Sequence, residues 1–443
     1  MRDVIIVGGG FAGLSAAVAL TARGVRVTLL EARPRLGGRA TSFRDRLTGE
    51  LIDNGQHVLF GCYRETLHFL RTINSEQLVL FQKSLDINYI DQHNRHSRFR
   101  CPCLPPPLHL IAGILEWDAL KFSERLSSLS MVKPLHRARH NQPITQEGET
   151  VREWLVRHGQ KPRLREFFWE PLALAALNQR ADLAAAELFT RVFKEFCDND
   201  IAASAVGIPT QPLKNFYTEP ARMFIESGGG EVRMKASAKI IISKGCLTGV
   251  ETGGELLMSR TVISAVPWFT FQSVFRDDPP ALASLRSSAA VRGSTSIVTV
   301  NIWFEQPVID EPFIGLIGRK MQWVFNKQVT CGNGGSYVSL VSSDADSFMH
   351  LSNQALEQLA VSELRSAIPK ALKTRVVHAI ALRERHAAFS LAPFEPERPR
   401  TETPIDGFFL AGDWIETGLP GTIESAVTSG HRAAAAAYEA LTK

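Results

Sequence analysis

The stretch from Val4 to Arg39 decides the fold of this chain. It reads VIIV over residues 4–7, GGGFAG over 8–13, LSAAVAL over 14–20 and VRVTLLE over 25–31. An apolar run, a glycine-rich turn, an alanine- and leucine-rich run and a second apolar run predict a strand, a turn, a helix and a strand. The glycines have the spacing G-x-G-x-x-G, so we expect a βαβ unit of an α/β fold that binds a dinucleotide.

Each glycine of this turn has its own task in such a site. Gly8 permits the tight turn, Gly10 lets the backbone approach a pyrophosphate, and Gly13 lets the helix pack closely on the strand. The pyrophosphate then lies at the helix N-terminus, where free N–H groups and the helix dipole favour negative charge. Glu31 ends the second strand, and its carboxylate is expected to accept hydrogen bonds from a ribose. The alternative is a purely structural glycine turn.

The residues after Glu31 indicate which dinucleotide is bound. The run RPRLGGR over 33–39 resembles the extended motif of the FAD-dependent amine oxidase and carotenoid desaturase superfamily. The resemblance implies that a second glycine pair approaches the diphosphate and that the arginines add positive charge to it. We therefore expect FAD rather than a nicotinamide dinucleotide.

A second motif near the end of the chain resembles the C-terminal FAD motif of the same superfamily. It reads LAGDW over 410–414 and TGLPGTIESAV over 417–427. The resemblance implies that Gly412 and Asp413 meet the diphosphate and ribityl chain, and that the last helix points N–H groups at the flavin pyrimidine. The residues expected to bind FAD are Gly8, Gly10, Phe11, Ala12, Gly13, Glu31, Ala32, Arg33, Gly37, Gly38, Arg39, Gly55, Gln56, His57, Ala238, Gly412, Asp413, Thr422 and Ile423.

Composition limits the remaining options. The chain has 443 residues, a net charge of +5 and six scattered cysteines. Its length predicts two connected domains, and no basic run with interleaved aromatic residues points to nucleic acid. The cysteines form no CxxC pair, so we expect reduced thiols and no metal site. No signal peptide or membrane-spanning run is apparent, which favours a cytoplasmic location.

Further motifs resemble those of the hydroxysqualene dehydroxylase family of bacterial hopanoid and squalene biosynthesis. They are DNGQH over 53–57, PLHL over 107–110, FWEPLALAALN over 168–178 and QWVF over 322–325. The resemblance implies an enzyme of isoprenoid lipid metabolism, in which reduced FAD converts hydroxysqualene to squalene with loss of the hydroxyl. It also implies a Rossmann-like FAD-binding domain of the amine oxidase and glutathione reductase type, with an interleaved substrate domain of mixed sheet and helices.

These two domains are expected to alternate along the chain. We assign residues 1–80, 206–275 and 396–443 to the FAD-binding domain, and residues 81–205 and 276–395 to the substrate domain. Within the latter we expect a hairpin of strands over 81–100, a break in the helices at 169–172 and a helix over 353–368. Residues 208–213 are interpreted as a linker.

Loss of a hydroxyl needs a hydride from the flavin and a proton donor or a stabilised cation. His57 is the first candidate acid, because it follows the segment that the resemblance places beside the flavin. Glu170 is the second, because a glutamate in an apolar site has a raised pKa. The alternatives are an ordinary hydrogen-bonded histidine and a helix-end carboxylate. Only one dinucleotide motif is present, so NAD(P)H would reduce the flavin transiently, or another electron donor is used.

Three other functions stay open at this point. A phytoene-type polyisoprenoid desaturase would move electrons in the opposite direction, and an amine oxidase would act on an unrelated substrate. A prenyl-lipid-binding protein of the GDP-dissociation-inhibitor type would use the same fold without flavin chemistry. The intact Glu31, Arg39 and Asp413 argue against this binding protein.

Residues 101–125 raise the question of membrane contact. A proline-rich loop leads into an apolar stretch at 111–115 and then to a segment with Lys121 and Arg125. Such a segment is typical of an interfacial helix, but also of a helix that packs on its own domain. Peripheral contact with the inner face of the cytoplasmic membrane is therefore one of two expectations.

Overall fold

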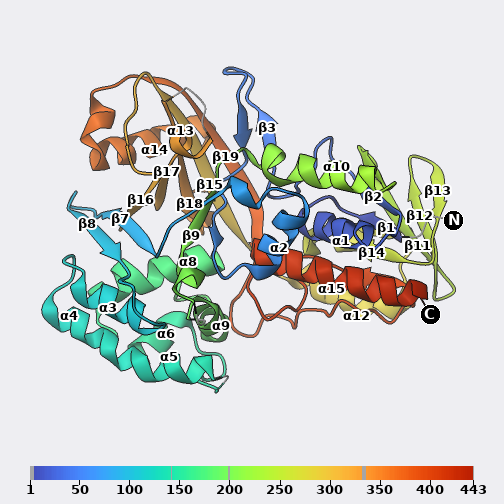
Figure 1. Ribbon diagram of the computed structural model, residues 1–443, viewed down its shortest axis with the longest axis horizontal. Coiled ribbons are helices and arrows are strands. Elements are labelled where there is room, and N and C mark those ends of the chain that lie inside the picture. The colour runs from blue at the N-terminus through green and yellow to red at the C-terminus, as the bar shows by residue number, and fades with distance from the viewer. Residues whose placement is uncertain (1–3, 141, 198–199, 332–335, 443) are drawn as a thin grey trace.

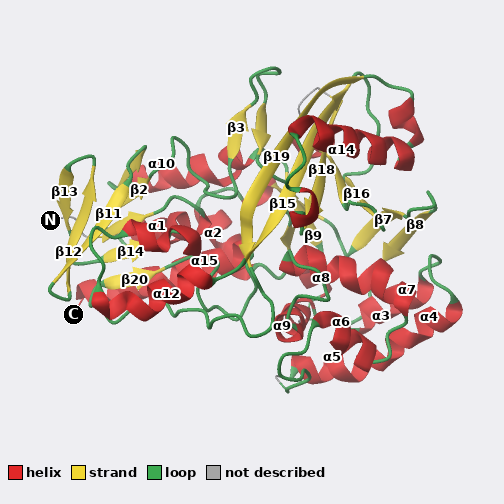
Figure 2. Cartoon of the chain, turned by 180° about the vertical axis from the view of Figure 1, so that it is seen from behind, coloured by secondary structure: helices red, strands yellow, loops and turns green. Residues whose placement is uncertain are grey.

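The computed structural model describes residues 4–140, 142–197, 200–331 and 336–442. The molecule is elongated, and both ends of the chain lie at the same end of the long axis (Figure 1). One half contains a parallel sheet with its helices. The other half contains a large sheet with a layer of helices below it, which Figure 2 shows from behind.

The first half is built on a five-stranded parallel sheet. Its order is β10 (Glu231–Met234), β2 (Val27–Glu31), β1 (Val4–Val7), β14 (Val262–Ser264) and β20 (Phe408–Leu410). The helices α1 (Phe11–Thr21), α10 (Glu219–Ser227) and α15 (Ile423–Thr442) belong to the same half. All four residues of β1 are buried, which explains the uninterrupted apolar run VIIV. The predicted βαβ unit is confirmed.

Smaller elements surround this sheet. An antiparallel sheet contains β11 (Ala238–Ser243), β12 (Cys246–Thr252) and β13 (Glu255–Met258). The pair β3 (Ser42–Arg44) and β4 (Leu51–Asp53) follows the first glycine motif, and α2 (Arg64–Thr72), α11 (Trp268–Phe271) and α12 (Ala283–Val291) complete this half. The strands of the parallel sheet come from the three segments that we assigned to FAD binding. The exact domain boundaries stay a prediction.

The second half is built on a seven-stranded mixed sheet. Its order is β19 (Val376–Phe389), β15 (Ser294–Phe304), β18 (Ser336–Ser343), β17 (Trp323–Asn326), β16 (Phe313–Leu316), β7 (Asp86–Ile90) and β8 (His96–Arg100). The predicted hairpin over 81–100 is thus β7 and β8 at one edge. On β15, Val298 and Val300 pack with α14 (Asn353–Ala367). Side chains alternate between the two faces of a strand, so Thr299 faces away from α14.

A layer of helices faces the other side of this sheet (Figure 2). It contains α3 (Leu108–Glu116), α4 (Phe122–Ser127), α5 (Val132–Arg139), α6 (Val151–Arg157), α7 (Pro162–Leu164), α8 (Glu170–Leu177) and α9 (Ala186–Phe196). The expected break at 169–172 is wrong. Residues Arg165–Trp169 form a π-helical turn that runs directly into α8, so the helix continues through Pro171.

The interpretation of residues 208–213 as a linker is also wrong in part. Residues Val206–Pro209 form β9, which pairs with β5 (Leu59–Phe60) and with β6 (Val79–Phe81). Local sequence did not reveal this strand, because its partners lie more than a hundred residues earlier in the chain.

Aromatic side chains fill the space between the large sheet and the helical layer. The ring of Tyr89 lies 5.4 Å from that of Trp117 and 6.1 Å from that of Trp323. The ring of Phe99 lies 4.9 Å from that of Phe168. These residues join one continuous apolar cluster with Phe167, Phe325 and Val341. The inner face of the sheet is therefore an aromatic surface.

Candidate functional site

Two glycine loops face each other at the carboxyl end of β1. Gly8 donates to Leu30 O (2.8 Å), and Gly37 donates to Gly9 O (2.7 Å), which ties the loops together. The helix α1 begins at Phe11, and its N-cap residue is Gly10, which has no side chain to cap it. The N–H groups of its first turn are therefore available for a phosphate, as the motif predicts.

Glu31 holds the first of these loops in place. Its carboxylate is buried and accepts hydrogen bonds from the N–H of Gly9 (2.8 Å) and of Arg33 (2.8 Å). Each carboxylate oxygen has a second lone pair, so these bonds leave room for a ribose hydroxyl. Shaping the loop is a role that the sequence did not reveal, and the ribose contact stays a prediction.

The C-terminal motif meets the N-terminal one through an ion pair. Arg39 Nη2 lies 2.5 Å from Asp413 Oδ1, while Arg39 Nη1 donates to Ala387 O (3.0 Å). The guanidinium also lies over the ring of Trp268, 5.1 Å from its centroid. Asp413 is buried, and its backbone carbonyl accepts from Ser425 Oγ (3.1 Å). Two motifs 374 residues apart thus form one structure.

The last helix begins where the motif predicts. The first residue of α15 is Ile423, and Thr422 Oγ1 accepts from the N–H of Ser425 (3.2 Å). Glu424 turns away from this end: its carboxylate accepts from the N–H of Glu65 (2.9 Å) and of Thr66 (2.9 Å), the start of α2. The N-terminus of α15 therefore presents N–H groups without a neighbouring free carboxylate.

The segment 53–57 rests on a buried lysine that sequence reasoning missed. Lys327, the first residue of α13 (Lys327–Cys331), places Nζ 3.0 Å from Gln56 Oε1 and 3.4 Å from Asp53 Oδ2. Burial alone would lower the pKa of Lys327, but Asp53 and Cys331 together outweigh burial and raise this pKa. A charged ammonium group therefore lies beside residues 53–57, the segment predicted to run past the flavin. Only the fold brings it there, and no local motif marks it.

His57 is uncharged in this environment. Its Nδ1 lies 3.1 Å from Gly55 O, and because a carbonyl only accepts, Nδ1 carries the proton of the neutral ring. Burial lowers the pKa of His57, Lys327 lowers it further, and Asp53 only partly offsets them. Near pH 7 the ring therefore offers Nε2 as a hydrogen-bond acceptor. The role of proton donor stays a prediction, and it requires that this ring first takes up a proton.

The environment expected for Glu170 is wrong. Its carboxylate is partly exposed and forms an ion pair with Arg152, at 3.1 Å between Oε1 and Nε. This is not an apolar site. The nearby Asn178 ends α8 in a left-handed conformation (φ 51°), and its Nδ2 donates to Thr295 Oγ1 (2.8 Å).

Ala238 begins β11 and is buried. The N–H of Ala236, two residues earlier, donates to Glu31 O (2.9 Å). Ala238, one of the residues expected to bind FAD, is thus close to backbone that is fixed to the end of β2.

The residues present fit FAD. A Cβ built on Gly10 would meet only Gly37 O, at 3.9 Å, so the backbone of Gly10 is open to a ligand on that side. Ser264 ends β14 at the carboxyl edge of the parallel sheet, where ligands of such sheets bind. Its buried Oγ has no hydrogen-bond partner within the described ranges. Open backbone, two helix N-termini and an unpartnered hydroxyl suit the diphosphate and sugar groups of a dinucleotide.

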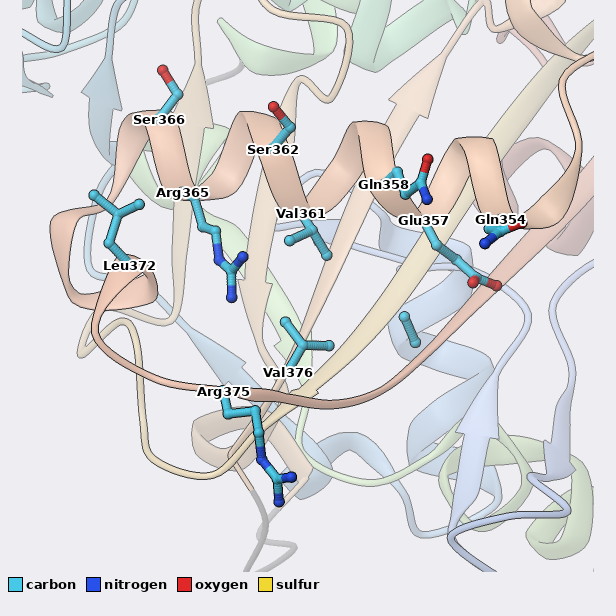
Figure 3. Close-up of a pocket in the computed structure, with 11 residues that line it drawn as sticks. Gln354, Glu357, Gln358, Val361, Ser362, Arg365, Ser366, Leu372, Arg375 and Val376 are labelled. Carbon is cyan, nitrogen blue, oxygen red and sulfur yellow. The ribbon is translucent and has the colours of Figure 1, made fainter.

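A groove of about 830 Å³ lies elsewhere, between α14 and β19. Figure 3 shows Val361 and Arg365 on the helix and Val376 on the strand around it. The groove lies on the α14 side of the sheet, whereas Thr299 and the aromatic surface lie on the other side. We therefore do not assign the reaction to this groove.

Comparisons with known proteins agree with this geometry. The family model for flavin containing amine oxidoreductase matches residues 11–437. The chain is 27% identical to the hydroxysqualene dehydroxylase of Zymomonas mobilis, over 97% of each chain. It is 28% identical to that of Rhodopseudomonas palustris, over 98% of this chain and 97% of the relative. It is 23% identical to a 15-cis-phytoene desaturase of an Oncidium hybrid cultivar, over 97% of this chain and 76% of the relative.

Solved structures show the same fold. A putrescine oxidase bound to putrescine superposes with a TM-score of 0.72 at 18% identity, with 98% of each chain covered. The cyclohexylamine oxidase of Brevibacterium oxydans gives 0.71 at 17% identity, with all of each chain covered. The predicted fold class and the predicted cofactor, FAD, are confirmed. The chain belongs to the flavin-containing amine oxidoreductase family and is an FAD-dependent oxidoreductase.

Proposed function

We propose that this enzyme reduces hydroxysqualene to squalene in bacterial squalene and hopanoid biosynthesis. The observation that carries the proposal is the similarity to hydroxysqualene dehydroxylases along nearly the whole chain. The aromatic side chains between the large sheet and the helical layer support it, because they are packed together in this structure and supply the apolar surroundings that a long polyisoprenoid needs. Tyr89, Phe167 and Trp323 belong to this surface or pack against it.

The reaction breaks one carbon–oxygen bond and forms one carbon–hydrogen bond. FAD, once reduced, supplies the hydride, and the hydroxyl leaves as water after it takes up one proton from solvent through the site. Aromatic faces stabilise positive charge that develops on carbon as the hydroxyl leaves. The charged Lys327 holds Gln56, and the neighbouring His57 offers Nε2 to a hydroxyl. NAD(P)H is the class of electron donor that we propose for reducing the flavin.

The alternative is a polyisoprenoid desaturase, which removes hydride from its substrate. The similarity to 15-cis-phytoene desaturases supports it, at lower identity. An amine oxidase has weaker support, since the solved amine oxidases share the fold at 17–18% identity.

An anaerobic half-reaction separates these alternatives. The purified flavoprotein is photoreduced, mixed with hydroxysqualene and followed by flavin absorbance, and the lipids are then extracted and identified. We expect flavin reoxidation with one squalene formed per flavin. A flavin that stays reduced, together with bleaching of the oxidised enzyme by phytoene, would replace the proposal with the desaturase. Bleaching by putrescine or cyclohexylamine would replace it with an amine oxidase.

Within residues 101–125, the apolar stretch 111–115 lies in α3 and packs on its own domain, since Ile111 and Ile114 are buried. We further propose that the protein binds the surface of the cytoplasmic membrane through α4 and the turn Ser128–Met131 that follows it. No helix in the described part of the chain is long and apolar enough to cross a bilayer. Phe122, Leu126 and Leu129 follow one another at helical spacing and are 75%, 42% and 47% exposed. Lys121 and Lys133 are exposed on either side of them. An outward apolar stripe beside lysines suits anionic lipid, and Figure 1 places α4 at the outer end of the helical layer.

Replacing this stripe is expected to detach the protein from membranes. The triple variant Phe122→Ser, Leu126→Ser, Leu129→Ser should bind vesicles of phosphatidylglycerol and phosphatidylcholine at least about tenfold more weakly, because about 0.8 kcal/mol is lost per buried CH₂. Sedimentation with vesicles measures this. The control is Leu47→Ser, which removes a side chain that is 79% exposed at the β3–β4 turn. Equal binding by the triple variant and the wild type would exclude α4 as the contact.

A further inference from the structure

We infer that Thr299 and His57 form the subsite that binds the hydroxyl of the substrate. This inference rests on the proposed function, and it names a side chain that recognises the leaving oxygen. The Thr299 hydroxyl is a buried polar group on the inner face of the large sheet, and the described residues offer it no hydrogen-bond partner. The inference gives this group a role in binding.

The Thr299 hydroxyl is buried without a partner. The residue is 1% exposed, and its Oγ1 makes no hydrogen bond to any described residue. An unsatisfied buried hydroxyl costs about 1–3 kcal/mol, so native proteins rarely retain one without a ligand or water to satisfy it. This free-energy cost indicates that a bound group forms a hydrogen bond with the Thr299 hydroxyl.

Thr299 lies on the face of β15 that is turned toward the aromatic surface. Its neighbours Val298 and Val300 pack with α14 on the other face. Its cross-strand partner on β18 is Val341, which belongs to the same cluster as the aromatic side chains of the helical layer. The hydroxyl is therefore a polar group beside an apolar cluster.

His57 and Thr299 both lie close to Gly55. A Cβ built on Gly55 would lie 3.5 Å from Thr299 Oγ1 and 3.8 Å from His57 Cε1. The neutral ring offers Nε2 as an acceptor, and a threonine hydroxyl both donates and accepts. A substrate hydroxyl can therefore donate to His57 Nε2 while it accepts from the Thr299 hydroxyl. Thr299 adjoins the 53–57 segment, which contains His57 and which the family resemblance places beside the flavin.

Thr295 provides the matched control on the same strand. It is four residues earlier and also buried, but its Oγ1 already accepts from Asn178 Nδ2 (2.8 Å). Thr295 is thus satisfied within the protein, whereas Thr299 is not. Removing the Thr295 hydroxyl should affect stability, and removing that of Thr299 should affect ligand discrimination.

The test compares two lipids that differ by one hydroxyl. Oxidised holoenzyme is titrated with hydroxysqualene and with squalene, and binding is followed by the change in flavin absorbance. We expect Thr299→Val to bind hydroxysqualene about 10- to 100-fold more weakly, because the hydroxyl loses its partner. Binding of squalene and retention of FAD should be unchanged, and Thr299→Ser should restore wild-type affinity for hydroxysqualene.

Thermal unfolding of the ligand-free protein adds a second measurement. Thr299→Val should unfold no earlier than the wild type, while Thr295→Val should unfold earlier because the Asn178 amide loses its acceptor. Loss of hydroxysqualene affinity in Thr295→Val but not in Thr299→Val would overturn the subsite. An unchanged ratio of the two lipid affinities in Thr299→Val would also overturn it, even where the wild type converts hydroxysqualene. A wild type that fails to convert hydroxysqualene would instead overturn the proposed function.

Discussion

Gly13→Ala is expected to yield protein without FAD and with reduced stability. A Cβ at this position would lie 1.9 Å from Gly8 O and 3.2 Å from the Cβ of Ala265. Gly8 is fixed because its N–H donates to Leu30 O, so neither backbone can move without separating α1 from the parallel sheet. We expect a loss of about 3 kcal/mol or more in the free energy of unfolding, the upper range for an overpacked core. The ratio of flavin to protein absorbance and a denaturant titration measure the two effects.

Gly10→Ala is the matched variant that separates cofactor binding from folding. Its Cβ would meet only Gly37 O at 3.9 Å, and Gly10 has an ordinary φ of −84°. The ligand-free variant should therefore be as stable as the wild type. The new methyl group nevertheless occupies the approach of the pyrophosphate, so FAD affinity should fall at least about tenfold. Wild-type FAD content in Gly10→Ala would show that the diphosphate does not lie at this loop.

The elements that carry these glycines could be predicted because their signals are local. Strand β1, helix α1 and strand β2 follow one another within thirty residues. A continuous apolar run beside a glycine turn is compatible with few structures other than a strand that leads into a helix. Helix α14 could likewise be predicted from the helical spacing of its apolar residues. In the same way the C-terminal motif specifies β20 and the start of α15 within a short stretch.

Two polar groups of the site, Lys327 and Thr299, could not be predicted, because the fold brings them to it from distant segments. Lys327 and Thr299 follow no motif, and each lies beside the 53–57 segment through the tertiary fold alone. The prediction for Glu170 was wrong for the opposite reason, because its apolar neighbours in the sequence suggested an apolar site. Helical geometry instead directs its carboxylate to Arg152, eighteen residues earlier.

Arg39→Met is expected to weaken FAD binding roughly 100-fold, which corresponds to about 2.7 kcal/mol. The substitution leaves the buried carboxylate of Asp413 without its ion-pair partner and removes the donor to Ala387 O. Breaking one side of a buried pair costs about 3–5 kcal/mol. Arg39 is partly exposed, so the loss here should lie below that range. Equilibrium dialysis of the deflavinated protein against FAD gives the affinity.

Two further variants test whether this effect belongs to the junction of the FAD motifs. Arg375→Met removes a guanidinium that is 76% exposed and paired with Glu305 on the surface. It should leave FAD affinity unchanged, because exposed pairs contribute about 0–1 kcal/mol. Arg39→Lys keeps the charge but has one donor group where Arg39 uses two, so only part of the affinity should return. If Arg39→Met binds FAD like the wild type, Asp413 does not need its partner, and the two motifs contribute to the cofactor site independently.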